Sequence, residues 1–407
     1  MKAEKLTRRD WLKLGAAGAA GLSGATILDL ASRGGARNAL AAHGLTSGAI
    51  KHGAVLDHQQ DMGVVGTTAT QDNFDPGTFL THFDYGEVQI RSDGRTVRHW
   101  DVIAVDRDIQ IAPGVWFSAW TYNGQVPGPT FRCTEGDILR VEFTNAGSHP
   151  HTIHFHGTHP TEMDGVEPIV QPGEKFTYEF EAKPFGLHLY HCHTMPLKRH
   201  IHKGLYGTFI VDPPEGREPA REMVMVMNAF DSNLDTENEV YAVNTAAFYH
   251  NEHPIRVGVN DLCRVYLVNV TEFDPVNSFH LHAGMFRVYK TGTQMDRYEL
   301  TDTIMMCQGE RHILEFNLEN PGSHMFHAHQ SEFAELGWLG AFEAVRNMNP
   351  NLVPWQEEMP YIWLDPCPRQ LSLNHQVKPW DQADMRHAIS LIIDRQQVVK
   401  IAYAPNL

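Results

Sequence analysis

The sequence FRCTEGDILRVEFTN, residues 131–145, has a counterpart in IRVGVNDLCRVYLVN, residues 255–269. A second pair follows, GEKFTYEF at residues 173–180 and GERHILEF at residues 309–316, and each member ends 11 residues before a histidine pair. Constant spacing between repeated segments indicates that one structural unit occurs twice. The segments are short, rich in Val, Phe, Tyr and Thr, and separated by Gly, Pro and Asn turns, which predicts antiparallel β-sandwiches.

The repeat divides the 407-residue chain into an all-β core and flanking segments. We expect two tandem Greek-key β-sandwiches, the first over residues 88–213 and the second over residues 220–349. Residues 43–87 precede them as a loop-rich arm. Residues 350–407 form a C-terminal extension that is partly helical, because residues 381–403 have helical rather than strand periodicity.

The N-terminus resembles a twin-arginine export signal over residues 1–42. TRRDWLK at residues 7–13 precedes a mildly apolar, Gly/Ala-rich stretch and a cleavage-like Ala39-Leu-Ala41. The alternative is a short buried helix. This resemblance predicts a periplasmic or secreted protein. No later stretch approaches the ~20 apolar residues of a membrane span, so we expect no membrane span in the mature protein.

Charge and cysteine content narrow the class of protein further. The formal net charge is −16, which argues against nucleic acid and anionic membranes as partners.

The cysteines show no paired spacing that would predict a disulfide framework, and we expect Cys133 and Cys263 to be buried strand residues. Methionines 223, 225 and 227 alternate, which fits either one apolar face of a strand or a track that handles copper. The five cysteines are Cys133, Cys192, Cys263, Cys307 and Cys367.

Histidines paired at strand spacing are the strongest chemical signal in the chain. Alternation in a strand puts both histidines of an HxH pair on one face, while the residue between them points the other way. Imidazole suits copper, and a thiolate with two imidazoles makes a blue-copper site. Structural histidines in a metal-free sandwich are the alternative, but four pairs in register with a repeat favour metal. The set comprises His154/His156, His191/His193, His280/His282 and His327/His329, with Cys192 inside the second pair and His151 and His200 nearby.

Together with YNGQVPGPT at residues 122–130, these motifs resemble the two-domain, laccase-like multicopper oxidases, whose fold is a pair of cupredoxin sandwiches. The resemblance implies that His151, Cys192 and His200 bind type 1 copper, with Leu205 in the axial position. The H-x-x-x-G-L ending selects His200 over His202, which we interpret as a strand histidine. Leucine cannot donate to the metal, so we expect a comparatively high redox potential.

The same resemblance distributes the paired histidines over a trinuclear cluster, for four coppers per chain. Asp164 resembles the acidic proton relay near type 2 copper, although an aspartate before Gly is also common in turns. The second domain departs from the type 1 pattern, with Asn277, Ala328 and Phe333 where ligands would stand. The implied ligands are His154 and His280 for type 2 copper, and His156, His191, His193, His282, His327 and His329 for the type 3 pair.

The implied activity is one-electron oxidation of a small reducing substrate coupled to four-electron reduction of O₂ to water. Phenols and aromatic amines are the expected donors, with Cu(I), Fe(II) or Mn(II) as alternatives. A copper nitrite reductase shares the fold, but it carries Asp at the position of His154 and lacks the second histidine of HCH. A copper-storage or electron-transfer protein is the non-enzymatic alternative. Related two-domain proteins place the cluster between subunits, so we expect a homotrimer; a monomer with an internal cluster is the alternative.

Overall fold

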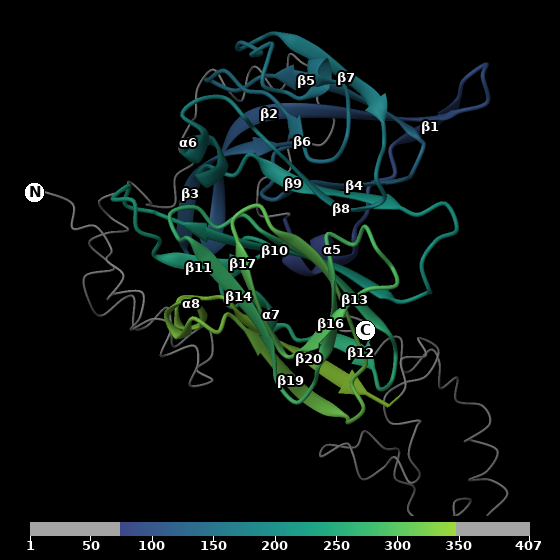
Figure 1. Ribbon diagram of the computed structural model, residues 1–407. Coiled ribbons are helices and arrows are strands. Elements are labelled where there is room, and N and C mark those ends of the chain that lie inside the picture. Colours follow the sequence, from purple (N-terminus) through teal and green to yellow (C-terminus); the bar gives the residue numbers. More distant parts are fainter. Residues whose placement is uncertain (1–73, 347–407) are drawn as a thin grey trace, which may run out of the picture. The chain divides into compact units, whose positions relative to one another are not determined.

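The computed structural model describes residues 74–346, which form two β-rich domains that follow one another along the chain (Figure 1). The mostly-β architecture confirms the predicted pair of cupredoxin-like sandwiches. The export signal, residues 43–73 of the arm, Cys367 and the C-terminal extension lie outside the described residues. A strand ends at Asp212 and the next begins at Arg221, so the Pro-rich segment between them connects the two domains.

The first domain consists of two sheets. One has the strand order β1-β2-β5-β7, with β3 paired to β2; the other has the order β4-β9-β8-β6. The strands are β1 (Glu87–Ile90), β2 (Thr96–Ala112), β3 (Val115–Tyr122), β4 (Gly128–Thr134), β5 (Ile138–Asn145), β6 (His154–Phe155), β7 (Lys175–Glu181), β8 (Gly186–His191) and β9 (Tyr206–Asp212).

The second domain also consists of two sheets, in the orders β11-β10-β13-β18-β15-β16 and β12-β20-β19-β14-β17. The strands are β10 (Arg221–Phe230), β11 (Val240–Val243), β12 (Ile255–Gly258), β13 (Cys263–Asn269), β14 (Val276–Leu281), β15 (Phe286–Lys290), β16 (Glu299–Thr301), β17 (Thr303–Cys307), β18 (Arg311–Phe316), β19 (Gly322–His327) and β20 (Leu339–Val345). Helix α5 (Pro76–Thr81) precedes β1, and short helices connect later strands: η2 (Thr161–Met163), α6 (Leu197–His202), α7 (Tyr249–Glu252) and α8 (Ser331–Glu335).

The sequence repeat is reproduced in the strand register. Strand β5 pairs antiparallel with β7, and β13 pairs antiparallel with β18, at the repeated segments. Across β6 and β8, His154 stands opposite His191; across β14 and β19, His280 stands opposite His327. A shift of the strand register by one residue would turn every side chain to the other face of the sheet. Because the register is shared, the paired histidines lie on the equivalent sheet face in both domains.

Burial of apolar side chains stabilises the strands that carry the paired histidines. Tyr122, Phe131, Phe143 and Tyr190 are fully buried in the core of the first domain. Cys133 and Cys263 are buried in strands, as the sequence predicted, and both are free thiols. Methionines 223, 225 and 227 of β10 are also buried, in a core that includes apolar residues of both domains. They are core residues and are inaccessible to a metal substrate.

A buried charge network joins the two domains. The Arg132 guanidinium of β4 donates to both carboxylate oxygens of Asp212 (2.7 and 3.0 Å) and of Glu222 (2.6 and 3.1 Å). Glu222 also accepts from Arg264 (3.0 Å) and from the Tyr266 hydroxyl (2.6 Å). These hydrogen bonds hold the pKa of Glu222 below its usual range despite burial, which alone would raise it.

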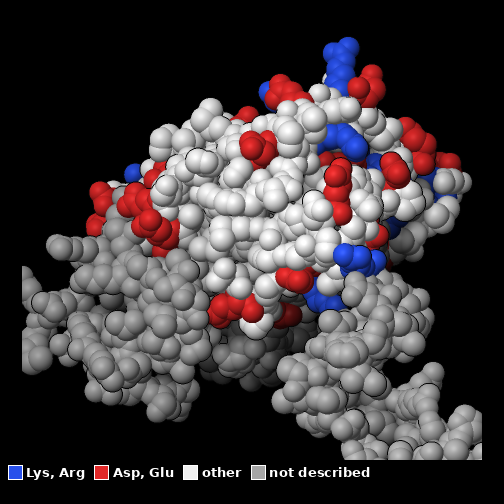
Figure 2. Space-filling model, turned by 90° about the horizontal axis from the view of Figure 1, so that it is seen from below, with Lys and Arg blue, Asp and Glu red and all other residues white. Residues whose placement is uncertain are grey.

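The surface agrees with the acidic composition. On the face drawn in Figure 2, the middle carries few charges, and Asp and Glu outnumber Lys and Arg toward its edges. Among residues 74–346, no helix is long and apolar enough to cross a membrane.

Candidate metal centre

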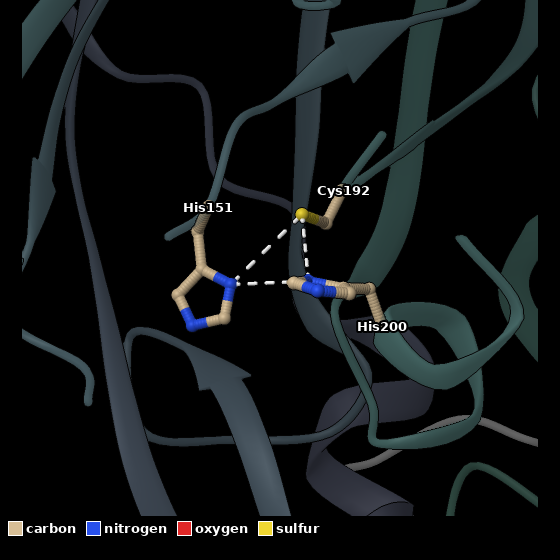
Figure 3. Close-up of side chains that lie close together, drawn as sticks. All are labelled: His151, Cys192 and His200. Atoms are coloured by element: carbon tan, nitrogen blue, oxygen red, sulfur yellow. Dashed lines mark hydrogen bonds between the residues drawn. The ribbon is translucent and has the colours of Figure 1, made fainter. Parts of the chain in front are cut away.

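One sulfur and two imidazoles meet in the core of the first domain (Figure 3). The Cys192 Sγ lies 3.2 Å from Nδ1 of His200 and 3.9 Å from Nδ1 of His151, and the two Nδ1 atoms are 3.2 Å apart. All three side chains are buried. Three soft or borderline donor atoms converge on one point that a copper ion could occupy, which is the donor set of a type 1 site.

Each of these side chains is positioned by a different local structure. Cys192 directly follows β8, and its N–H donates to the Leu205 carbonyl (3.0 Å). His151 precedes β6 and forms a backbone bridge with Val170. His200 lies in α6, so the prediction that its neighbour His202 is a strand residue was wrong. Residues two apart on a helix point in opposite directions, and the His202 ring instead accepts from the N–H of Asp231 (3.1 Å).

The surroundings of this group favour neutral imidazoles, the form in which histidine binds a metal. Burial lowers the pKa of His151 to about 3 and that of His200 to about 4, and burial raises the pKa of the Cys192 thiol. A cation bound by the sulfur would favour the thiolate instead. The N–H of Thr152 points at the Cys192 sulfur (3.4 Å), and Leu205 lies in the same buried cluster as Cys192. The Trp120 ring packs against both His151 and His200.

Four histidines of the first domain form a second group, which includes His191 and His193, the two sequence neighbours of Cys192. The Nε2 atoms of His156 and His191 are 3.2 Å apart, and His154 completes a set whose ligand atoms lie within 4.8 Å of one another. The His193 ring is 5.3 Å from the His154 ring. His191 is fixed through Nδ1, which bonds to the Cys192 carbonyl (2.9 Å), so its Nε2 is turned toward His156.

Asp164 contacts the group through His154. The Nδ1 atom of His154 lies 2.6 Å from the Asp164 carbonyl and 3.2 Å from its Oδ1. The close approach depends on Gly165, whose φ is +75° and whose place a Cβ could not occupy, because it would lie 1.9 Å from the Ile153 carbonyl oxygen. The sequence suggested Asp164 only by resemblance and gave no sign of the role of Gly165.

The second domain has an equivalent arrangement of histidines, with equivalent hydrogen bonds. The Nε2 atoms of His282 and His327 are 2.9 Å apart, and Nδ1 of His327 bonds to the Ala328 carbonyl (2.6 Å). His280 is oriented through Nδ1 by the Asp302 carbonyl (2.9 Å), with the His329 ring 5.2 Å away. Asp302 is therefore the counterpart of Asp164, and sequence reasoning did not identify it.

A matched hydroxyl holds the last histidine of each set. The N–H of His193 donates to the Thr152 hydroxyl (3.1 Å), and the N–H of His329 donates to the Ser278 hydroxyl (2.7 Å). Thr152 and Ser278 occupy equivalent places, two residues before the first histidine of an HxH pair. That shared spacing is the signal by which the sequence could have revealed them.

Within residues 220–346, the second domain has no counterpart of the sulfur site. Asn277, Ala328 and Phe333 are buried where His151, Cys192 and His200 would stand. Helix α8 takes the place of α6, and its Phe333 stacks on Tyr241 with the ring centroids 4.1 Å apart. Apolar packing of Ala328 and Phe333, together with Asn277, whose amide donates to the Thr271 hydroxyl (3.1 Å), occupies the place of a metal and its ligands.

The two histidine sets lie apart within the chain. Across residues 74–346, no interaction joins a histidine of the first set to one of the second. The first set instead faces Gln308, Gly309 and Arg311 of the second domain. His282 of the second set is exposed, and His280 and His327 are half-buried. Each domain thus carries its own set of four histidines.

Comparisons with known proteins agree with this geometry. Two multicopper oxidase family profiles match residues 105–216 and 217–347. A solved multicopper oxidase is 54% identical, covering 66% of this chain and 96% of that protein, with a TM-score of 0.65. The blue copper oxidase from Nitrosomonas europaea is 28% identical, covering 61% of this chain and 86% of that protein, with a TM-score of 0.55. A copper-containing nitrite reductase of Neisseria meningitidis is 28% identical over 271 residues, which are 61% of this chain and 70% of the reductase.

The chain therefore belongs to the multicopper oxidase family. It is a two-domain member related to copper nitrite reductases and blue copper oxidases, which confirms the resemblance found in the sequence. Its copper sites comprise a His/Cys/His group of type 1 character and histidine triads.

Proposed function

We propose that this protein is an oxidase that takes single electrons from a reducing substrate at the His151–Cys192–His200 group and reduces O₂ to water at a trinuclear cluster. The observation that carries the proposal is the presence of both His154 and His193, whose rings lie 5.3 Å apart in the first histidine set. A nitrite reductase needs three histidines for a single type 2 copper. By resemblance, such enzymes carry Asp at the first of these positions and lack the second.

Bound copper would supply the one-electron and oxygen chemistry, and the residues of the chain supply the connections. Cys192 is covalently joined to His191 and His193, so the sulfur group and the histidine cluster share one short stretch of backbone. The Asp164 carboxylate, 38% exposed and 3.2 Å from Nδ1 of His154, can hold a proton at the edge of the cluster. We propose that His151, Cys192 and His200 bind type 1 copper, with Leu205 in the non-coordinating axial position, and that the eight paired histidines bind type 2 and type 3 copper.

The half-sites support a homotrimer with a cluster at each subunit junction. Each domain presents one set of four histidines, and the second-domain set opens to solvent. A head-to-tail contact that closes into a ring would bring the first set of one subunit to the second set of the next. Trimer formation thereby completes a site that a single chain leaves divided.

For the donor we propose a phenol or aromatic amine rather than a metal ion. The methionines that could have formed a copper track are buried in a core. The Trp120 ring, which contacts both His151 and His200, gives an aromatic path toward the sulfur group. We also propose that the protein is exported by the twin-arginine pathway and is periplasmic or secreted.

Copper per chain, measured by elemental analysis against amino-acid quantitation, is the first test. About four coppers per chain, a trimeric mass by light scattering and phenol-dependent O₂ uptake are the expected results. About two coppers with nitrite consumption would make the protein a nitrite reductase. Copper with a blue band but no turnover would make it an electron-transfer or storage protein.

A further inference from the structure

Arg311 places a positive charge on the wall of the first histidine pocket. It begins β18 of the second domain and reaches across to the first domain, where its Nε donates to the Leu187 carbonyl (3.1 Å). Its Nη1 donates to the Gly309 carbonyl (3.4 Å). Both acceptors are neutral, so they orient the guanidinium without cancelling its charge.

The pocket beside this guanidinium has a volume of about 450 Å³ and includes His154, His156, His159 and Asp164 in its lining. Asp164 is the one carboxylate among these lining residues, and it is turned to His154. Within the described part of the chain, no carboxylate forms an ion pair with Arg311. The pocket therefore combines three imidazoles with a guanidinium that has no salt-bridge partner among the described residues.

Metal ions on the histidines would add further positive charge to the same space. This inference rests on the proposed function only in that it takes the histidines to bind copper. A guanidinium offers a planar fork of N–H donors that matches a planar oxyanion bidentately. We propose that Arg311 is the protein half of a binding site for a small, planar, monovalent oxyanion, such as nitrite, formate or bicarbonate, beside the histidine cluster.

The internal repeat provides a matched control. Lys175 is the basic residue at the equivalent position of the first copy, in GEK at residues 173–175 against GER at residues 309–311. Lys175 begins β7 and is exposed to solvent. Only the copy in the second domain therefore places its basic side chain in a histidine pocket, and Lys175→Gln removes the same charge from a position outside it.

The test is isothermal titration of sodium nitrite, and separately of sodium formate and of sodium fluoride as a spherical anion, into copper-loaded protein in the absence of any donor. Loss of charge-assisted hydrogen bonds should weaken binding about 10- to 100-fold in Arg311→Gln. Arg311→Lys keeps the charge but loses the fork, so it should recover fluoride binding and only partly recover nitrite binding. Lys175→Gln should bind nitrite as the wild type does.

Copper content, measured in every variant, separates loss of the anion site from loss of the cluster. Unchanged nitrite affinity in a fully loaded Arg311→Gln protein would overturn the proposal. So would the failure of wild-type protein to bind either oxyanion at millimolar concentration. If Arg311→Gln does not fold or hold copper, Arg311→Lys carries the test through its nitrite-to-fluoride ratio. Because no turnover is involved, the result is independent of whether the protein consumes O₂.

Discussion

The two domains share a strand register and a histidine face, yet among residues 74–346 only the first domain contains a sulfur site. His154 opposite His191 and His280 opposite His327 show how closely the frameworks match. At the position equivalent to Cys192, the second domain has Ala328, with Phe333 where His200 would stand. The comparison teaches that the sandwich provides the location of a type 1 site, whereas a few buried side chains decide whether that location binds metal or fills with hydrocarbon.

Cysteine exchange between the domains should have the largest effect. Cys192→Ala removes the sulfur ligand, so the blue absorption band should disappear and donor oxidation should fall at least 1,000-fold, on the order of a lost essential group. Ala328→Cys should not create a second blue band, because Asn277 and Phe333 cannot replace imidazoles. Visible absorption and electron paramagnetic resonance check both results. A blue band that survives in Cys192→Ala would show that the sulfur site has been misidentified.

The cluster histidines should, in contrast, be equally important in both domains. His193→Ala and His329→Ala each remove one ligand from a shared cluster, so each should abolish O₂ uptake while leaving the blue band of the first domain intact. Oxygen-electrode rates, copper content and absorption spectra are the measurements. Full activity in His193→Ala would exclude the trinuclear assignment, and a lost blue band in His329→Ala would contradict the separation of the two kinds of site.

The attachment of the domains to each other depends on buried charge. Arg132→Ala leaves the carboxylates of Asp212 and Glu222 without their main partner, so it should lower the free energy of unfolding by about 3–5 kcal/mol. Arg140→Ala is the control, because the pair of Arg140 with Glu179 is about one-third exposed and should contribute less than about 1 kcal/mol. Urea unfolding of both variants tests this. Equal losses would mean that burial of the network adds nothing.

Acid should destabilise the copper-free protein through buried histidines that are not copper ligands in our assignment. His188 is 2% exposed, and burial lowers its pKa to about 4. Because the unfolded chain titrates near 6.5, it binds more protons than the folded chain between about pH 6.5 and 4. Stability is therefore full above this window and falls as the pH is lowered through it.

His188→Phe should reduce that pH dependence by up to about 1.4 kcal/mol per pH unit. Urea unfolding of copper-free protein at pH 7 and pH 4.5 gives the slope. At pH 7 the variant should lose about 1 kcal/mol for the missing bond from Nε2 to the Pro184 carbonyl. In the second domain, His324 is the equivalent of His188. Its Nε2 bonds to the carbonyl of Asn320, which is also four residues earlier in the chain. An unchanged pH slope in His188→Phe would mean that this ring does not titrate on unfolding.

Much of the site could be predicted because its residues are close in sequence. Alternation along a strand fixes the direction of each HxH pair, and the repeat fixes that there are two copies. Asp302, which orients His280, escaped prediction because it lies 22 residues away in sequence and reaches the ring only through the pairing of β14 with β17. The sequence selected His200 over His202 through the H-x-x-x-G-L resemblance, but it did not suggest that both residues lie in a helix, α6.

The sequence by itself determined the duplicated β architecture, the ligand types and the absence of a sulfur site from the second domain. These depend on residue identity and short-range periodicity. The tertiary structure decided which atoms meet: Asp302 against His280, Asp164 against His154 by way of Gly165, and Arg311 in a pocket of the other domain. Those contacts join residues from separate strands and domains, and their distances are set by packing rather than by any local pattern.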